Sequence, residues 1–211
     1  MPYTVRVDTN AALERLDRLI QKRMAPGVDQ DAVDAHIWDL FGETWAVMFT
    51  DLSGFSRRVA EFGIIHFLQI IYESQRVFVP CLDEYGGILL KVEADSMLVI
   101  FRKVRRAVEC AIAMQKAAKA YNVGRPEEEQ LLLCLGLGYG AMLRVGDHDV
   151  FGAEVNAASK LGEDTARAWE ILVTQNVKDI VEREEMDGLS FEPLTYVPPG
   201  ADAAYRLLYP L

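Results

Sequence analysis

Two apolar stretches that each carry an aspartate stand out in the pattern of hydrophobic and polar positions along the chain. Residues 45–51 are mostly apolar up to Asp51, which predicts a strand buried on both faces. Residues 87–93 and 96–101 form the second stretch, predicted as two strands joined by a tight connection that contains Asp95. These three strands are the first part of a predicted sheet.

Helical periodicity separates the strands. Residues 64–85 place apolar side chains at helical spacing, with Pro80 expected to kink the helix, and residues 103–121 show a similar pattern after the third strand. The other predicted elements are a short helix near residues 55–62, a hairpin of residues 131–139 and 141–146 turning at Gly140, a helix over 152–166, a strand over 170–173, a helix over 174–184, and closing strands over 189–197 and 203–209.

The core elements therefore follow the order strand, helix, strand, strand, helix, strand, which is the split βαβ pattern. We predict an α+β fold with a ferredoxin-like βαββαβ core sheet and extra C-terminal strands and helices. Residues 43–211 would form this domain, preceded by a short helical N-terminal segment over residues 1–42.

The N-terminal segment is predicted to contain two helices. The first covers residues 11–24 and is broken by proline and glycine at residues 26 and 27. Asp29 or Asp31 could cap the second helix, which would turn one apolar side inward, made of Val33, Ile37 and Leu40. Two interpretations stay open: a prefix that packs on the main domain, or a dimerisation or regulatory segment.

The composition is that of an ordinary globular protein, with 51% hydrophobic and 26% charged residues among 211. The net charge of −10 argues against a nucleic-acid surface, which needs a basic face. No apolar run is long enough to predict a membrane span, and the first residues lack a signal core, so we expect a cytoplasmic protein. Three cysteines in apolar surroundings are expected to be buried free thiols: Cys81, Cys110 and Cys134.

The split βαβ pattern has a consequence for the two aspartates. The third strand would lie antiparallel between the parallel first and second strands, about 4.8 Å from its neighbours. The end of strand 45–51 would then lie beside the start of strand 96–101, which brings Asp51 and Asp95 to the same edge. Close carboxylates repel unless a cation joins them, and Mg²⁺ typically uses one or two carboxylates plus substrate phosphates.

A small turn follows the first strand and leads toward a predicted helix. Free backbone N–H groups at such a turn, with glycine allowing close approach, are suited to a phosphate. The turn consists of Leu52, Ser53, Gly54, Phe55 and Ser56. The simpler alternative is that Asp51 caps this helix and Asp95 is an ordinary turn residue.

Three segments resemble the signature blocks of the class III nucleotidyl cyclases, the adenylyl and guanylyl cyclase catalytic domains. They read FTDLSGFS at 49–56, GGILLKVEADSMLVIF at 86–101 and FGAEVNAASKLGE at 151–163, and the resemblance covers about residues 43–185. It implies conversion of ATP to 3′,5′-cyclic AMP and pyrophosphate. It also implies two Mg²⁺ or Mn²⁺ ions per active site on Asp51 and Asp95, with phosphate contacts from the backbone of residues 52–56.

The resemblance further implies a homodimer with shared active sites, in which the metal aspartates and the base-reading residues come from different protomers. Lys91 and Asp149 correspond to the base-reading pair and suit adenine, because lysine can donate to N1 and the carboxylate can accept from the amino group. Asn156 corresponds to the residue that orients the ribose. Lys160 stands where the family has an arginine that stabilises charge on the phosphate.

The chain departs from the family pattern at three positions. Lys160 keeps the positive charge but lacks the bidentate guanidinium fork. Ala94 replaces a glycine before Asp95, at a cost of about 1 kcal/mol if the backbone there needs a positive φ. Glu93 replaces an apolar residue. Two alternatives to an adenylyl cyclase therefore stay open: a catalytically weak or inactive nucleotide-binding signalling module, and a guanylyl cyclase.

Overall fold

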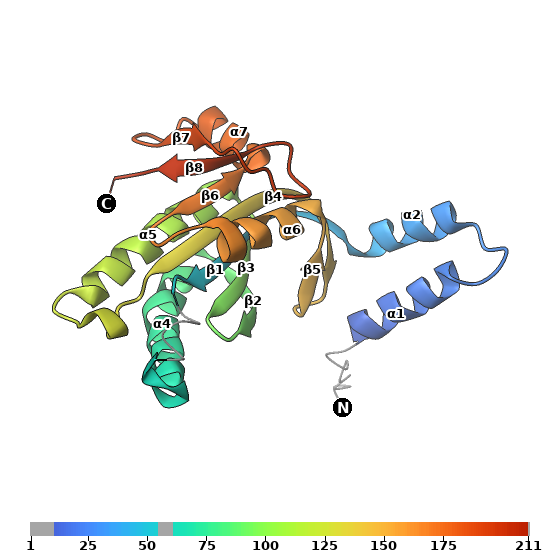
Figure 1. Ribbon diagram of the computed structural model, residues 1–211. Coiled ribbons are helices and arrows are strands. Elements are labelled where there is room, and N and C mark those ends of the chain that lie inside the picture. Colours follow the sequence, from blue (N-terminus) through green and yellow to red (C-terminus); the bar gives the residue numbers. More distant parts are fainter. Residues whose placement is uncertain (1–10, 55–60, 211) are drawn as a thin grey trace, which may run out of the picture.

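The computed structural model describes residues 11–54 and 61–210, and in these ranges the chain forms an α+β domain around one eight-stranded sheet (Figure 1). The strand order is β2-β3-β1-β4-β6-β8-β7, and β5 pairs with β4. The strands are β1 (Gly42–Leu52), β2 (Ile88–Glu93), β3 (Ser96–Phe101), β4 (Leu133–Val145), β5 (Asp149–Phe151), β6 (Ile171–Thr174), β7 (Ser190–Pro193) and β8 (Ala204–Leu208).

Helices cover both faces of this sheet. They are α4 (Ile64–Tyr85), α5 (Val104–Asn122), α6 (Ala153–Ser159) and α7 (Gln175–Arg183), and a π-helical segment (Lys160–Thr165) continues α6. In β1, Ala46 and Met48 pack into the cluster under α4 and α5, whereas Trp45 and Val47 pack into the cluster under α6. The first strand is therefore buried on both faces, as its apolar run predicts.

The predicted core order is confirmed. β3 lies between β2 and β1 and is antiparallel to both, so β1 and β2 are parallel. Thr50 near the end of β1 pairs with Met97 near the start of β3. This register brings Asp51 next to the β2–β3 turn that contains Asp95, which is the juxtaposition expected from the split βαβ pattern.

The predicted hairpin around Gly140 is wrong. β4 is one continuous strand whose residues 133–143 pair with all of β1, and Gly140 lies opposite Trp45 within it. The glycines of β4 serve packing rather than turning: a Cβ on Gly136 would lie 2.2 Å from the Ala158 carbonyl oxygen, and one on Gly138 would lie 2.5 Å from the Glu154 carbonyl oxygen. Glycine therefore lets α6 and the start of the π-helical segment lie directly on the strand backbone.

Helix α4 has the predicted bounds, runs through Pro80 and ends where Gly86 adopts a left-handed conformation with φ 71°. Other boundaries differ in smaller ways. The first closing strand is shorter than the predicted 189–197, and β5 was not predicted. The predicted helix near residues 55–62 falls mostly outside the described residues. The three cysteines are free and buried, as expected.

Two N-terminal helices, α1 (Ala11–Arg23) and α2 (Gln30–Phe41), precede β1 and extend to one side of the domain (Figure 1). Asp29 caps α2 by accepting a hydrogen bond from the Ala32 N–H at 3.1 Å. The buried side of α2 contains Phe41 in place of the predicted Leu40, which is exposed, and it packs with Leu143 of β4. The segment thus contacts the main domain, and its dimerisation or regulatory role stays a prediction.

None of the helices in the described ranges has the length and apolar character required to cross a membrane.

Candidate active site

The carboxyl groups of Asp51 and Asp95 meet at the edge where β1 ends. Burial, the negative charge of Asp95 and a hydrogen bond with Asp95 raise the pKa of Asp51 to about 7. Burial also raises the pKa of Asp95, and the charge of Glu163 adds to the effect at both aspartates. A backbone hydrogen bond from Leu52 lowers both pKa values but does not reverse the shifts.

This pair fits a divalent cation. Two converging carboxylates offer the hard oxygen ligands that Mg²⁺ prefers, and a cation between them would relieve their repulsion. Within residues 11–54 and 61–210, no third His, Cys, Asp or Glu joins them closely enough to make a three-residue metal cluster. Mg²⁺ usually completes such a site with substrate phosphates and water.

The backbone next to the pair has positive φ angles in two turns, one before Asp95 and one after β1. Ala94 adopts φ 52°, so the condition under which alanine before Asp95 is costly is met. In the turn after β1, Gly54 has φ 78° and an open environment, while the Ser53 N–H donates to the Leu132 carbonyl oxygen at 2.8 Å. The other predicted phosphate contacts, Phe55 and Ser56, lie outside the described residues.

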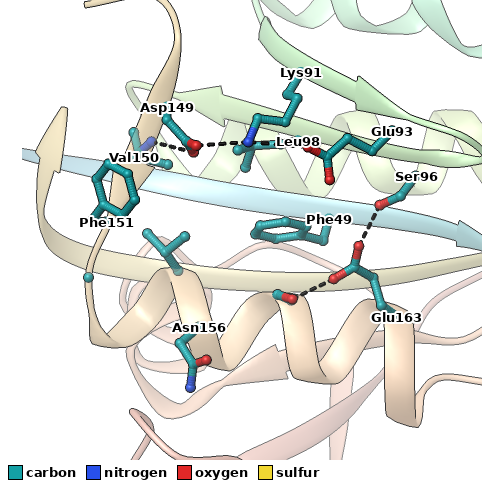
Figure 2. Close-up of a pocket in the computed structure, with 13 residues that line it drawn as sticks. Phe49, Lys91, Glu93, Ser96, Leu98, Asp149, Val150, Phe151, Asn156 and Glu163 are labelled. Atoms are coloured by element: carbon teal, nitrogen blue, oxygen red, sulfur yellow. Dashed lines mark hydrogen bonds and ion pairs between the residues drawn. The ribbon is translucent and has the colours of Figure 1, made fainter. Parts of the chain in front are cut away.

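A second group of predicted residues lines a cavity of about 290 Å³ between the β2–β3 hairpin, β5 and α6 (Figure 2). Lys91 Nζ donates to Asp149 Oδ2 at 2.8 Å, and the Val150 N–H donates to Asp149 Oδ1 at 2.9 Å. The hydrogen bond to Asp149 raises the pKa of Lys91 further above its ordinary value. Lys91 and Asp149 therefore form an ion pair, which a base-reading role and a purely structural role both allow, and Glu93 lies 3.4 Å from the same ammonium group.

Several residues of the cavity were not predicted. Phe49, Leu98 and Val155 supply apolar surface, and β5 brings Asp149 into reach of Lys91. Glu163 accepts hydrogen bonds from Ser96 Oγ at 2.7 Å and from Ser159 Oγ. Glu163 and Ser159 lie within the third signature block, which was the signal in the sequence that could have pointed to them. The contact of Glu163 with Ser96 could not be predicted, because it depends on how the sheet places the two segments.

Asn156 and Lys160, the two predicted catalytic residues, each form a hydrogen bond within the chain. Asn156 borders the cavity, and its Nδ2 donates to the Pro199 carbonyl oxygen at 2.8 Å. Lys160 donates to Asp164 Oδ2 at 2.6 Å and does not line the cavity. The structure therefore separates the predicted site residues into a carboxylate pair, a cavity group and a lysine held by a neighbouring carboxylate.

The sequence of residues 42–195 matches the family model described as the adenylate and guanylate cyclase catalytic domain. The chain belongs to this family. The family resemblance of the three signature segments is thereby confirmed.

Two curated relatives cover only part of this domain. A Rhizobium meliloti (strain 1021) protein named "Putative adenylate cyclase 3" is 31% identical over 116 residues, 55% of this chain and 20% of that protein. The serine/threonine-protein kinase pkn2 of Myxococcus xanthus is 28% identical over 131 residues, 62% of this chain and 16% of that protein. The chain thus spans a fifth or less of the length of these relatives.

Solved structures share the fold. An adenylate/guanylate cyclase/hydrolase from Silicibacter pomeroyi has a TM-score of 0.68 at 22% identity, covering 81% of this chain and 98% of that one. The adenylyl cyclase CyaB from P. aeruginosa has a TM-score of 0.64 at 19% identity, covering 81% and 96%. The α+β architecture is therefore that of a class III nucleotidyl cyclase domain.

Proposed function

We propose that the protein is an adenylyl cyclase that works as a homodimer, with each active site built from both protomers. The observation that carries this proposal is that Asp51 and Asp95 do not line the cavity of Lys91, Asp149 and Asn156, although Glu163 of that cavity acts on both aspartates. The polyphosphate of a nucleotide would need the metal ions held by the carboxylate pair, and its base would need the cavity. Two protomers facing one another would bring the carboxylate pair of one onto the cavity of its partner.

Asp51 and Asp95 would hold the metal ions, Mg²⁺ or Mn²⁺, with two per active site. When bound, such ions supply Lewis-acid stabilisation of the triphosphate and make the attacking hydroxyl more acidic. The supporting observation is that both carboxyl groups have raised pKa values in the free protein, so a cation would stabilise their charged form. The backbone of residues 52–56 would contact the phosphates, but the Ser53 N–H would first have to leave the Leu132 carbonyl oxygen, to which it donates in the free protein.

Lys91 and Asp149 would read the base. A lysine donor beside a carboxylate acceptor matches N1 and the amino group of adenine, and their 2.8 Å ion pair keeps both groups at the cavity wall. Guanine presents a donor at N1 and an acceptor at C6, so a lysine facing N1 favours ATP over GTP. The apolar surface of Phe49, Leu98 and Val155 would accommodate the faces of the purine ring.

In the proposed reaction the ribose 3′-hydroxyl oxygen bonds to the α-phosphorus, and the bond between that phosphorus and the bridging oxygen to the β-phosphate breaks. Pyrophosphate leaves with the bond electrons, and the hydroxyl proton passes to solvent. Asn156 would orient the ribose, and the Lys160 ammonium would stabilise the charge that grows on the phosphate oxygens. Lys160 would have to exchange Asp164 for phosphate, since the two are paired in the free protein.

A mixing experiment tests the shared site. Asp51→Ala and Asn156→Ala proteins should each be nearly inactive with ATP and Mn²⁺, because every active site lacks one group. In an equal mixture that exchanges subunits, half of the dimers are mixed and each has one intact site, so about a quarter of wild-type cyclic AMP formation should return. Inactive mixtures despite proven subunit exchange would contradict the shared site.

The first alternative, a nucleotide-binding signalling module without turnover, is favoured by two observations: Ala94 is held at φ 52°, and Lys160 is engaged by Asp164. It predicts ATP binding without cyclic AMP formation. The second alternative, a guanylyl cyclase, predicts cyclic GMP from GTP in a parallel assay.

A further inference from the structure

The loop of residues 195–203 between β7 and β8 lies against α6, the helix that carries Asn156. Its base is closed by a hydrogen bond from the Leu194 N–H to the Ala204 carbonyl oxygen at 2.9 Å. Gly200 in this loop lies against Ala153, and the charge of Asp202 acts on Glu154. The loop therefore lies at the first turn of α6.

Pro199 of this loop determines which way the Asn156 side chain faces. Asn156 Nδ2 lies 2.8 Å from the Pro199 carbonyl oxygen. A carbonyl oxygen can only accept a hydrogen bond, so the amide nitrogen must face Pro199 and the amide oxygen must face away from it. The contact therefore fixes the amide orientation and turns Oδ1, an acceptor, away from Pro199.

Several features of the loop restrict the position of the Pro199 carbonyl group. Pro198 is buried, both prolines restrict φ, and the Ala201 N–H closes a turn on the Pro198 carbonyl oxygen at 3.3 Å. Gly200 has φ 101°, and a Cβ there would lie 2.2 Å from the carbonyl oxygen of Ala153, the first residue of α6. Only glycine allows the loop to sit this close to the helix.

We propose that the loop of residues 195–203 is a positioning element of the active site, in which the Pro199 carbonyl holds Asn156 in the orientation used at the ribose. Pro199 and Gly200 do not contact the nucleotide in this proposal; they act through Asn156. The inference rests on the proposed function, because it assumes that Asn156 contacts the substrate during cyclisation.

Two glycines allow a matched test with wild-type full-length protein as reference. Gly200→Ala and Gly188→Ala both put alanine at an exposed position with positive φ, 101° and 74°, but Gly188 has no heavy atom within 4 Å of its Cβ position. Both variants therefore carry backbone strain, and only Gly200→Ala pushes the loop away from α6.

With ATP and Mn²⁺, we expect Gly200→Ala to lower kcat by roughly 10-fold relative to Gly188→Ala, with KM for ATP changed less than about 2-fold. A general loss of stability would instead lower the melting temperature and the active fraction of both variants. Equal kcat values in the two variants, with active wild-type protein, would overturn the loop proposal alone. Absence of product from the wild type would overturn the proposed function and this inference with it.

Pro199→Gly provides a second test if Gly200→Ala does not fold. Pro199 is exposed, so the variant should fold, and it keeps the carbonyl while freeing φ. We expect a smaller fall in kcat, about 3-fold, again with KM nearly constant. An unchanged kcat in Pro199→Gly would also contradict the proposal.

Discussion

Ala94 is the position where a single substitution should make the protein more stable beside its candidate metal site. It holds φ 52° in the turn between β2 and β3, directly before Asp95, and its side chain is exposed. An L-residue in the left-handed region costs roughly 1–2 kcal/mol, and glycine avoids that cost but adds about 0.5–1 kcal/mol of unfolded-state entropy. Ala94→Gly should therefore stabilise the fold by about 0.5–1 kcal/mol.

For a chain of this size, such a gain raises the melting temperature by roughly 1–4 °C. Thermal and urea unfolding would measure it, and Glu185→Gly is the matched control. Glu185 is also exposed and has φ 46°, but it lies in the turn after α7, away from the candidate site. Both variants should gain similar stability, and only Ala94→Gly should alter metal-dependent activity. Stabilisation by Glu185→Gly together with loss of stability in Ala94→Gly would refute the strain argument.

Three further predictions concern charge and packing. The raised pKa of Asp51 contributes stability that is fully present below about pH 4 and is lost as the pH rises through about 7. Without metal at pH 8, the free energy of unfolding of Asp51→Asn should therefore exceed that of the wild type by about 1–2 kcal/mol, after allowing for solvent screening. Equal urea midpoints would contradict this prediction. Lys160→Arg should raise kcat several-fold because the fork binds phosphate bidentately, and steady-state kinetics would show it. Gly136→Ala should lower the melting temperature by roughly 5 °C or more, since its Cβ would lie 2.2 Å from the Ala158 carbonyl oxygen.

Much of the core could be predicted because its signals are local. The apolar run before Asp51 and the periodicity of residues 64–85 depend on nearby side chains, and they gave the correct order of β1, α4, β2 and β3. The approach of Asp51 to Asp95 followed from topology alone. Because β1 pairs antiparallel with β3, the end of β1 and the start of β3 lie at the same edge of the sheet. That is why residues far apart in sequence could be paired in advance.

The sequence-based predictions failed where contacts between distant parts of the chain determine the local structure. Gly140 has the appearance of a turn glycine, but a Cβ there would lie 2.9 Å from Glu154 Cγ, a contact made by a helix that follows later in the chain. The bonds of Glu163 to Ser96 and Ser159 depend on the π-helical segment, and the partner of Asn156 comes from a loop 43 residues further along. No periodicity in the sequence encodes these contacts.

Nucleotide turnover by wild-type, Asp51→Ala and Asp95→Ala proteins, each with ATP and Mn²⁺ or Mg²⁺, tests the role of the two carboxylates most directly. We expect cyclic AMP and pyrophosphate in equal amounts from the wild type and essentially none from either folded variant. Equal product from all three proteins would contradict the role of the two carboxylates.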